Sequence, residues 1–213
     1  MIIHSFQGGF DKNLSYLIWC KKTKIAAIID PAVEINPMIE LINKYDLILE
    51  KIFITHTHHD HISHLNDFLY LYPNIQVLCY NKSNFDIEFK GIAHDEIVTV
   101  GQELIICLHT PGHYYDSICF WNKSKKALFT GDTIFVGRTG RTVSSRSNIN
   151  DLYNSVYNTI LKLPTDTTIY PGHHYGYKKS ITINDNIQCS KFFQSKSLSE
   201  FIKTMKDFEL YRK

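Results

Sequence analysis

Short apolar runs separated by turn residues predict β-strands along most of the chain, and a few segments show helical spacing instead. The predicted strands are residues 15–20, 25–30, 51–55, 75–80, 97–100, 104–109, 117–121, 126–130 and 168–170. Helices are predicted over residues 36–45, 62–72 and 151–163, and a capping-box pattern at Ser197 and Glu200 opens another over about 197–210. Many short strands with interspersed helices predict a layered α/β sandwich.

Length and composition are those of an ordinary globular protein. The 213 residues are expected to form a single domain, residues 1–213, that includes the C-terminal helix. Lysine and arginine (23) nearly balance aspartate and glutamate (21), so the net charge of +2 gives no electrostatic case for a nucleic acid or a membrane as partner. Oligomeric state stays open.

The first residues and the cysteines indicate the cytoplasm. The segment 1–9 has neither a basic region nor a long apolar region, so a secretory signal is not predicted. The five cysteines are an odd number, widely spaced and without a CxxC pair. They are therefore predicted to be reduced, mostly buried thiols.

Histidine is the one unusual count, with 11 in 213 residues, and four of these lie within residues 55–61 (THTHHDH). This segment follows a predicted strand and precedes a predicted helix, so it is expected to be a loop at the end of a sheet. His56 and His58 are two apart and face the same side of an extended backbone, so both imidazoles can reach one cation. Asp60 and His61 lie where the chain turns into the helix. Two nearby ions could share these four ligands more readily than one tetrahedral ion could.

Three more candidate ligands follow predicted strands further along the chain. His113 lies in a TPGH turn, Asp132 in a TGD turn and His173 in a PGH turn. Each turn contains a glycine, which lets the backbone adopt tight conformations beside a site. Together with the first cluster, these turns predict a metal centre.

These residues resemble the metallo-β-lactamase fold superfamily, whose HxHxDH motif is followed by a distant histidine, aspartate and histidine. The resemblance spans about residues 11–175 and implies an αββα sandwich of two central mixed sheets flanked by helices. It assigns His56, His58 and His113 to a first metal, and Asp60, His61 and His173 to a second, with Asp132 bridging the two. The implied cofactors are two divalent ions, expected to be zinc, although iron and manganese suit the same ligands.

Within the superfamily, residues 130–142 and 171–176 are similar to the glyoxalase II-like and persulfide dioxygenase-like branch. By this resemblance Arg141 and Tyr175 bind substrate. The family's usual GGCGR or GGCGK loop reads GRTGR here, at residues 137–141, and the stretch after His173 is too short for the helical glutathione-binding domain of full-length glyoxalase II. The chain therefore resembles a short, hydroxyacylglutathione hydrolase-like member of the branch.

The expected activity is metal-dependent hydrolysis of a small-molecule thioester, such as an S-2-hydroxyacylglutathione. A metal-bridging hydroxide oriented by the catalytic residues Asp60 and Asp132 would attack the carbonyl. A thiolate leaves readily, so no strong general acid is needed. The alternative is an oxidoreductase with one iron, similar to a persulfide dioxygenase; the aspartate that follows GRT in that pattern is Val143 here. A degenerate member that only binds ligands is a further alternative, which the complete set of seven metal ligands disfavours.

Overall fold

The computed structural model describes residues 1–211, and most of its strands form two six-stranded sheets. The first sheet contains, in spatial order, β1 (Ile2–Gly8), β2 (Asn13–Trp19), β3 (Ile25–Ile29), β4 (Ile48–Phe53), β5 (Gln76–Tyr80) and β6 (Lys90–Ile92). Its strands β1 to β3 are antiparallel, and β3 to β6 are parallel. The sheet is therefore mixed.

The second sheet is also mixed. It contains, in spatial order, β7 (Ile97–Val100), β8 (Glu103–His109), β9 (Ile118–Asn122), β10 (Ala127–Gly131), β13 (Thr168–Pro171) and β14 (Ile181–Thr182). Only β10 and β13 pair in parallel; the other neighbours are antiparallel. Strands β11 (Ile134–Phe135) and β12 (Arg138–Thr139) form a small antiparallel hairpin. Along the chain, this hairpin follows β10 and precedes the helices that cover the second sheet.

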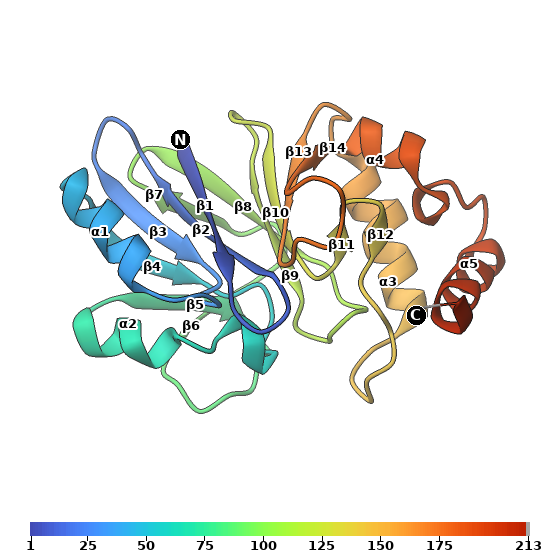
Figure 1. Cartoon of the computed structure of the whole chain (residues 1–213), viewed down its shortest axis with the longest axis horizontal. Coiled ribbons are helices and arrows are strands. Elements are labelled where there is room, and N and C mark those ends of the chain that lie inside the picture. The colour runs from blue at the N-terminus through green and yellow to red at the C-terminus, as the bar shows by residue number, and fades with distance from the viewer. Residues whose placement is uncertain (212–213) are drawn as a thin grey trace.

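Helices cover the outer faces of both sheets (Figure 1). Against the first sheet lie α1 (Asn36–Lys44), the 3₁₀ turn η1 (His59–His61) and α2 (Leu65–Leu71). Against the second lie α3 (Ile149–Asn154), the π turn η2 (Ser155–Thr159), η3 (Ile160–Lys162), α4 (Ile183–Cys189), η4 (Lys191–Phe193) and α5 (Leu198–Tyr211). The layers are helices, sheet, sheet and helices, which is the predicted αββα sandwich.

The strand pattern explains this layering, because successive residues of a strand face opposite sides of its sheet. On β4, Ile52 packs beneath the helices of the first sheet, whereas Phe53 points between the sheets. On β9, Phe120 also points between the sheets, 4.8 Å from the Phe53 ring, and Cys119 faces the helices of the second sheet. Strands that are apolar on both faces are therefore buried on both faces.

All nine predicted strands and all four predicted helices are present, with ends shifted by a few residues. The predicted helix 62–72 begins at Leu65, because residues 59–61 form the separate turn η1. The helix predicted over 151–163 begins at Ile149, where the Asn148 side chain accepts hydrogen bonds from two backbone N–H groups, and it changes to π and 3₁₀ geometry from Ser155 onward. One half of the predicted capping box is present at Ser197, whose Oγ accepts from Glu200 N at 3.3 Å. The Glu200 carboxylate accepts from the backbone N–H of Lys196 at 2.7 Å instead of from that of Ser197.

The sequence reading missed the edge strand β1, the short strands β6, β11, β12 and β14, and helix α4. None of these has a long apolar run, and β1 exposes or half-exposes every residue. The five thiols are unpaired, and all except Cys189 are buried, as expected. Among the described residues, no helix is long and apolar enough to cross a membrane.

Candidate metal centre

The histidine-rich segment lies where β4 ends, at the carboxyl edge of the first sheet. After Phe53 the chain bends at Thr55, is extended at His58 and then turns into η1, which contains His59 to His61. His56 and His61 are almost fully buried, and His58 and Asp60 are half-buried. The loop brings the His56 and His58 rings together, and the 3₁₀ turn brings Asp60 and His61 toward the same centre.

The remaining three candidates come from the second sheet. His113 lies on the loop after β8, Asp132 directly follows β10, and His173 follows β13. Gly172 is required by close packing, since a Cβ built there would lie 2.5 Å from both Asp132 Oδ1 and His61 Cε1. The strand ends of both sheets therefore converge on one place, as the sequence predicted.

His56, His58 and His113 form one possible ligand group. His58 Nδ1 lies 2.9 Å from His56 Nε2 and 3.2 Å from His113 Nε2. Two ligands held about 2.0–2.1 Å from a tetrahedral ion lie roughly 3.3 Å apart. The three nitrogen atoms therefore have the spacing of atoms around one cation.

Asp60, His61 and His173 form a second group. His173 Nε2 is 3.2 Å from His61 Nε2 and 3.3 Å from Asp60 Oδ2. Asp132 lies between the groups, because its Oδ2 is 3.4 Å from His173 Nε2 and 3.6 Å from His113 Nε2. The structure thus brings all seven predicted ligands together, in two groups with Asp132 between them.

His113 and His173 each use Nδ1, the ring nitrogen that faces away from the other ligands, for a hydrogen bond within the protein. Their Nε2 atoms, which face the other ligands, are therefore available for a cation. His113 Nδ1 donates to the backbone oxygen of Arg141 at 2.8 Å, and His173 Nδ1 donates to that of Asp11 at 2.9 Å. An acceptor on Nδ1 leaves the neutral imidazole with a lone pair on Nε2. These lone pairs point at other acceptors, and Asp132 Oδ1 is buried without a hydrogen-bond partner. The arrangement therefore fits divalent cations between the ligand atoms.

The sequence reading missed Asp30, which orients ligands of both groups. Its carboxylate is 1% exposed and accepts from Thr55 N at 2.7 Å, from Thr55 Oγ1 at 2.7 Å and from His61 Nδ1 at 2.8 Å. Because Thr55 Oγ1 gives its hydrogen to Asp30, it can only accept from His56 Nδ1, 3.2 Å away. Asp30 thus sets the tautomer of His61 directly and that of His56 through Thr55. The sequence signal that could have identified Asp30 is its place at the end of the apolar run 25–30.

Asn13 and Asp116 are further buried polar residues at the centre that the sequence reading did not single out. Asn13 Nδ2 donates to Asp60 Oδ2 at 3.0 Å and fixes that carboxylate. Asp116 accepts from Thr57 Oγ1 at 2.6 Å, so it ties the histidine-rich loop to the loop after β8. No spacing pattern marks either residue, because each acts through a contact between distant segments.

The electrostatics differ between the two ligand groups. Burial lowers the pKa of His58 to about 4, and the neighbouring His113 acts in the same direction, so this imidazole is neutral at pH 7. Burial also opposes protonation of His173, but Asp132 and Asp60 outweigh it and raise the His173 pKa to about 9. Burial would raise the pKa of Asp132, but His173 and His61 hold it well below its usual range. Positive charge, whether a proton on His173 Nε2 or a cation in its place, is therefore favoured beside Asp60 and Asp132.

A cavity of about 640 Å³ opens beside the ligands and contains the predicted substrate-binding residues Arg141 and Tyr175 in its wall. Tyr175 Oη donates to Asp11 Oδ2 at 2.6 Å, and the tyrosine ring stacks on His173 with ring centroids 4.8 Å apart. Arg141 makes a two-point ion pair with Glu209 of α5. Both residues lie at the cavity, but their polar groups already have partners within the chain.

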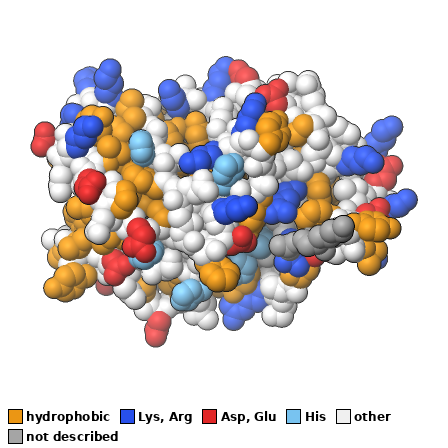
Figure 2. All heavy atoms as spheres, in the orientation of Figure 1, with side chains coloured by type: hydrophobic (Ala, Val, Ile, Leu, Met, Phe, Trp, Pro, Cys, Tyr) orange, Lys and Arg blue, Asp and Glu red, His pale blue; other side chains and the backbone are white. Residues whose placement is uncertain are grey.

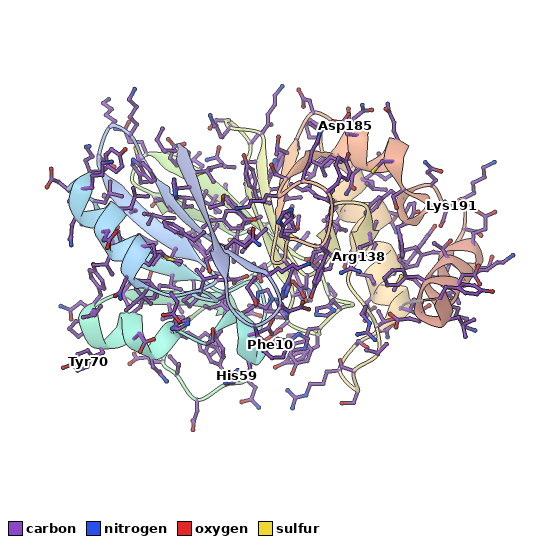
Figure 3. The ribbon with its side chains drawn as sticks, viewed as in Figure 1. Phe10, His59, Tyr70, Arg138, Asp185 and Lys191 are labelled. Atoms are coloured by element: carbon purple, nitrogen blue, oxygen red, sulfur yellow. The ribbon has the colours of Figure 1, made fainter. Side chains whose placement is uncertain are left out.

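Other histidines and charges lie around this centre. His59 is exposed and lines the cavity, whereas His174 Nδ1 lies 3.1 Å from Gln7 Oε1. Phe10 and His59 lie below and to the left of Arg138 in Figure 3, and all three line the same cavity. Lysine and arginine side chains are interspersed with acidic ones on the face shown in Figure 2, in keeping with the small net charge.

An αββα sandwich with imidazole and carboxylate ligands at one edge of its two sheets defines a class of divalent-metal-binding proteins. The sequence profile of the metallo-beta-lactamase superfamily matches residues 8–173. The chain belongs to this superfamily.

Named relatives extend the comparison. The chain is 38% identical over 172 residues to a probable hydroxyacylglutathione hydrolase of Schizosaccharomyces pombe, covering 78% of this chain and 66% of the relative. It is 35% identical over 164 residues to a hydroxyacylglutathione hydrolase of Francisella tularensis subsp. novicida, covering 77% and 64%. The chain thus spans about two-thirds of the length of these relatives. The crystal structure of ETHE1 from Myxococcus xanthus superposes with a TM-score of 0.86 at 30% identity, covering 100% of this chain and 93% of that one.

Proposed function

We propose that this protein hydrolyses thioesters with the help of two divalent metal ions, and that S-2-hydroxyacyl derivatives of glutathione are its substrates. The observation that carries the proposal is the convergence of seven metal-ligand side chains beside a cavity whose wall contains arginines. The names of the Schizosaccharomyces and Francisella relatives support the same substrate class.

The residues of the chain would have distinct parts in this reaction. Bound divalent ions supply water activation at neutral pH and polarise a carbonyl oxygen. Asp60 and Asp132 orient the attacking water, and Asn13 keeps the Asp60 carboxylate in place through its amide. The departing thiol has a pKa of about 8.5, so it leaves as a thiolate and needs no strong acid.

Zinc and a cytoplasmic location complete the proposal. Imidazole and carboxylate ligands with the spacing of a tetrahedral site suit zinc, and iron or manganese are the alternatives. Five cysteines without a disulfide fit a reducing compartment.

The second candidate is an oxidoreductase with a single iron, similar to a persulfide dioxygenase. One ion would need only the group around His56, His58 and His113 together with Asp132. The separate group of Asp60, His61 and His173, with its imidazoles oriented by outer hydrogen bonds, favours two ions and therefore hydrolysis.

Thiol release from S-lactoylglutathione by the metal-loaded protein tests the proposal. His58→Ala and Asp132→Ala are expected to lower kcat/KM by at least about 1000-fold, since each removes a ligand of the centre. His4→Ala is the matched control, because His4 is an exposed histidine on β1 outside both ligand groups. Circular dichroism and elemental analysis of each variant separate loss of metal from loss of fold.

Two results would contradict hydrolysis. The first is a wild-type rate on a panel of thioesters no higher than that of the two ligand variants. The second is oxygen uptake on glutathione persulfide by iron-loaded protein that releases no thiol from thioesters; that result would favour the dioxygenase.

A further inference from the structure

His58 differs from the other four candidate imidazole ligands in how its ring is held. The other four use their second ring nitrogen for a hydrogen bond to a protein oxygen, which is Thr55 Oγ1 for His56, Asp30 Oδ2 for His61, and the backbone oxygens of Arg141 and Asp11 for His113 and His173. His58 directs Nδ1 toward the other ligands, and its Nε2 makes no hydrogen bond to any residue within 1–211. A different contact is therefore needed to fix this ring.

A histidine ring without such a hydrogen bond has only a weak orientation of its own. The last torsion of the histidine side chain joins an sp³ carbon to an sp² carbon, and its energy minima are broad. When a ligand imidazole turns about this torsion, its nitrogen moves away from the ideal metal position, so loss of ring orientation weakens metal binding. Packing against a neighbouring side chain is the other means of holding the ring.

The Tyr114 ring supplies this packing. Its centroid lies 4.2 Å from that of the His58 ring, at an interplanar angle of 51°, and 6.2 Å from that of the His56 ring. Apart from the rings of other ligands, Tyr114 is the one aromatic ring of the described chain that contacts His58. An aromatic ring at this distance restricts rotation of the imidazole, and the pair adds a favourable aromatic contact.

The protein in turn holds Tyr114 at both ends. Its backbone oxygen accepts from Gly112 N at 3.2 Å and from Ser117 N at 3.3 Å, within the loop between β8 and β9. Its hydroxyl oxygen accepts from Arg146 Nη1 at 3.3 Å. The half-buried ring between these contacts is therefore placed by the fold and can hold His58 in turn.

We propose that Tyr114 is a positioning residue for the first metal, whose ring keeps His58 Nδ1 directed at the cation in place of the hydrogen bond that the other imidazoles have. The assignment depends on the proposed metal centre and not on thioester hydrolysis. Within the described chain, the ring contacts between Tyr114 and ligands are confined to the first group. Tyr114 therefore acts on one metal position and not on the other.

Substitutions at Tyr114 and at its neighbour test this role. Tyr114→Leu keeps an apolar side chain but removes the ring, and it is expected to weaken metal binding at one position about 2- to 10-fold, the range for loss of one aromatic contact. Tyr114→Phe keeps the ring and loses only an exposed hydroxyl contact, so wild-type affinity is expected. Tyr115→Leu is the matched control, because Tyr115 also has a half-buried ring, which packs on Tyr114 at 4.9 Å and on no ligand.

Two measurements read the effect without substrate. Chelator competition resolves the two binding steps of zinc, and the step that is missing in His58→Ala identifies the first position. The visible absorption spectrum of the cobalt-loaded protein reports the geometry of the ligands. It is expected to change in Tyr114→Leu and to stay as in the wild type in Tyr114→Phe and Tyr115→Leu.

Three results would overturn the assignment. They are equal losses of affinity in Tyr114→Leu and Tyr115→Leu, equal losses in Tyr114→Leu and Tyr114→Phe, and equal weakening of both binding steps in Tyr114→Leu. A wild type that binds two ions with the expected dependence on Tyr114, but releases no thiol from thioesters, would leave the assignment intact and contradict hydrolysis. Unchanged zinc binding and an unchanged cobalt spectrum in Tyr114→Leu would remove the role of Tyr114, while thiol release by the wild type would still support the proposed function.

Discussion

Replacing Asp30 by asparagine is expected to weaken both metal positions although Asp30 is not a predicted ligand. Its Oδ2 accepts from Thr55 Oγ1 and from His61 Nδ1, and its Oδ1 accepts from Thr55 N. Asparagine has the same shape, but one of its two terminal atoms is an NH₂ donor. Whichever way the amide is turned, at least one of these donors will face another donor.

Each orientation of the amide has a defined cost. With its nitrogen at the Oδ2 position, it donates to His61 Nδ1 and forces the hydrogen of His61 onto Nε2, the atom that faces the metal. The Thr55 hydroxyl is then free to donate to His56, which has the same effect on the first group. With its nitrogen at the Oδ1 position, the buried Thr55 N–H loses its acceptor, which costs about 1–3 kcal/mol of folding stability.

Loss of the hydrogen-bond partner that orients a metal-binding imidazole commonly lowers metal affinity 10- to 100-fold, which corresponds to about 1.4–2.8 kcal/mol. Chelator competition on the apoprotein, read with elemental analysis, measures this change, and urea unfolding of the apoprotein measures the folding cost. Asp67→Asn is the control, since Asp67 accepts from His64 Nδ1 at 2.8 Å on the exposed part of α2, outside the centre. Wild-type metal affinity at both positions, together with an unchanged free energy of unfolding, in the Asp30→Asn protein would refute the argument.

Three further experiments test the packing at the centre, a buried hydrogen bond beside it and the stability that bound metal adds. Gly172→Ala is expected to reduce activity at least tenfold with metal content lowered, because the new Cβ would lie 2.5 Å from Asp132 Oδ1 and His61 Cε1; unchanged elemental analysis and kcat would contradict this. Tyr16→Phe removes the buried donor to the backbone oxygen of Pro171, 2.7 Å away, and is expected to cost about 1–2 kcal/mol in urea unfolding. Removal of metal by chelator dialysis is expected to lower the melting temperature, since free metal at 1000 times Kd contributes about 4 kcal/mol; equal melting curves would show that the ions add no stability.

Much of the fold follows from local sequence, because strands buried on both faces have continuous apolar runs that are easily read. The run 25–30 and the run 126–130 are such strands, and both belong to the centres of their sheets. The edge strand β1 has alternating exposed and half-exposed residues, and its position depends on pairing with β2. Propensity alone therefore could not identify it.

The candidate metal ligands were readable because each lies on a loop or turn that follows a strand, and strand ends of both sheets meet at one edge. The partners that orient them were not readable, because their roles arise from contacts across large sequence distances. Asp30 reaches His61, and Asn13 reaches Asp60, through the folded arrangement of segments that show no common motif. The partner of Arg141 is equally remote, since Glu209 lies on the last helix of the described chain.

Because the candidate ligands come from both sheets, metal binding is linked to how the two sheets are held together. His56, His58, Asp60 and His61 follow β4 of the first sheet, whereas His113, Asp132 and His173 follow strands of the second. Each candidate group draws on both sheets, so a bound ion joins them at one edge of the sandwich. Without a cation, the imidazole lone pairs and the Asp132 carboxylate that converge there need protons or water molecules as partners. Metal affinity and the closure of the two sheets at this edge are therefore thermodynamically linked, and a substitution that loosens the sheet contact must weaken metal binding without touching a ligand.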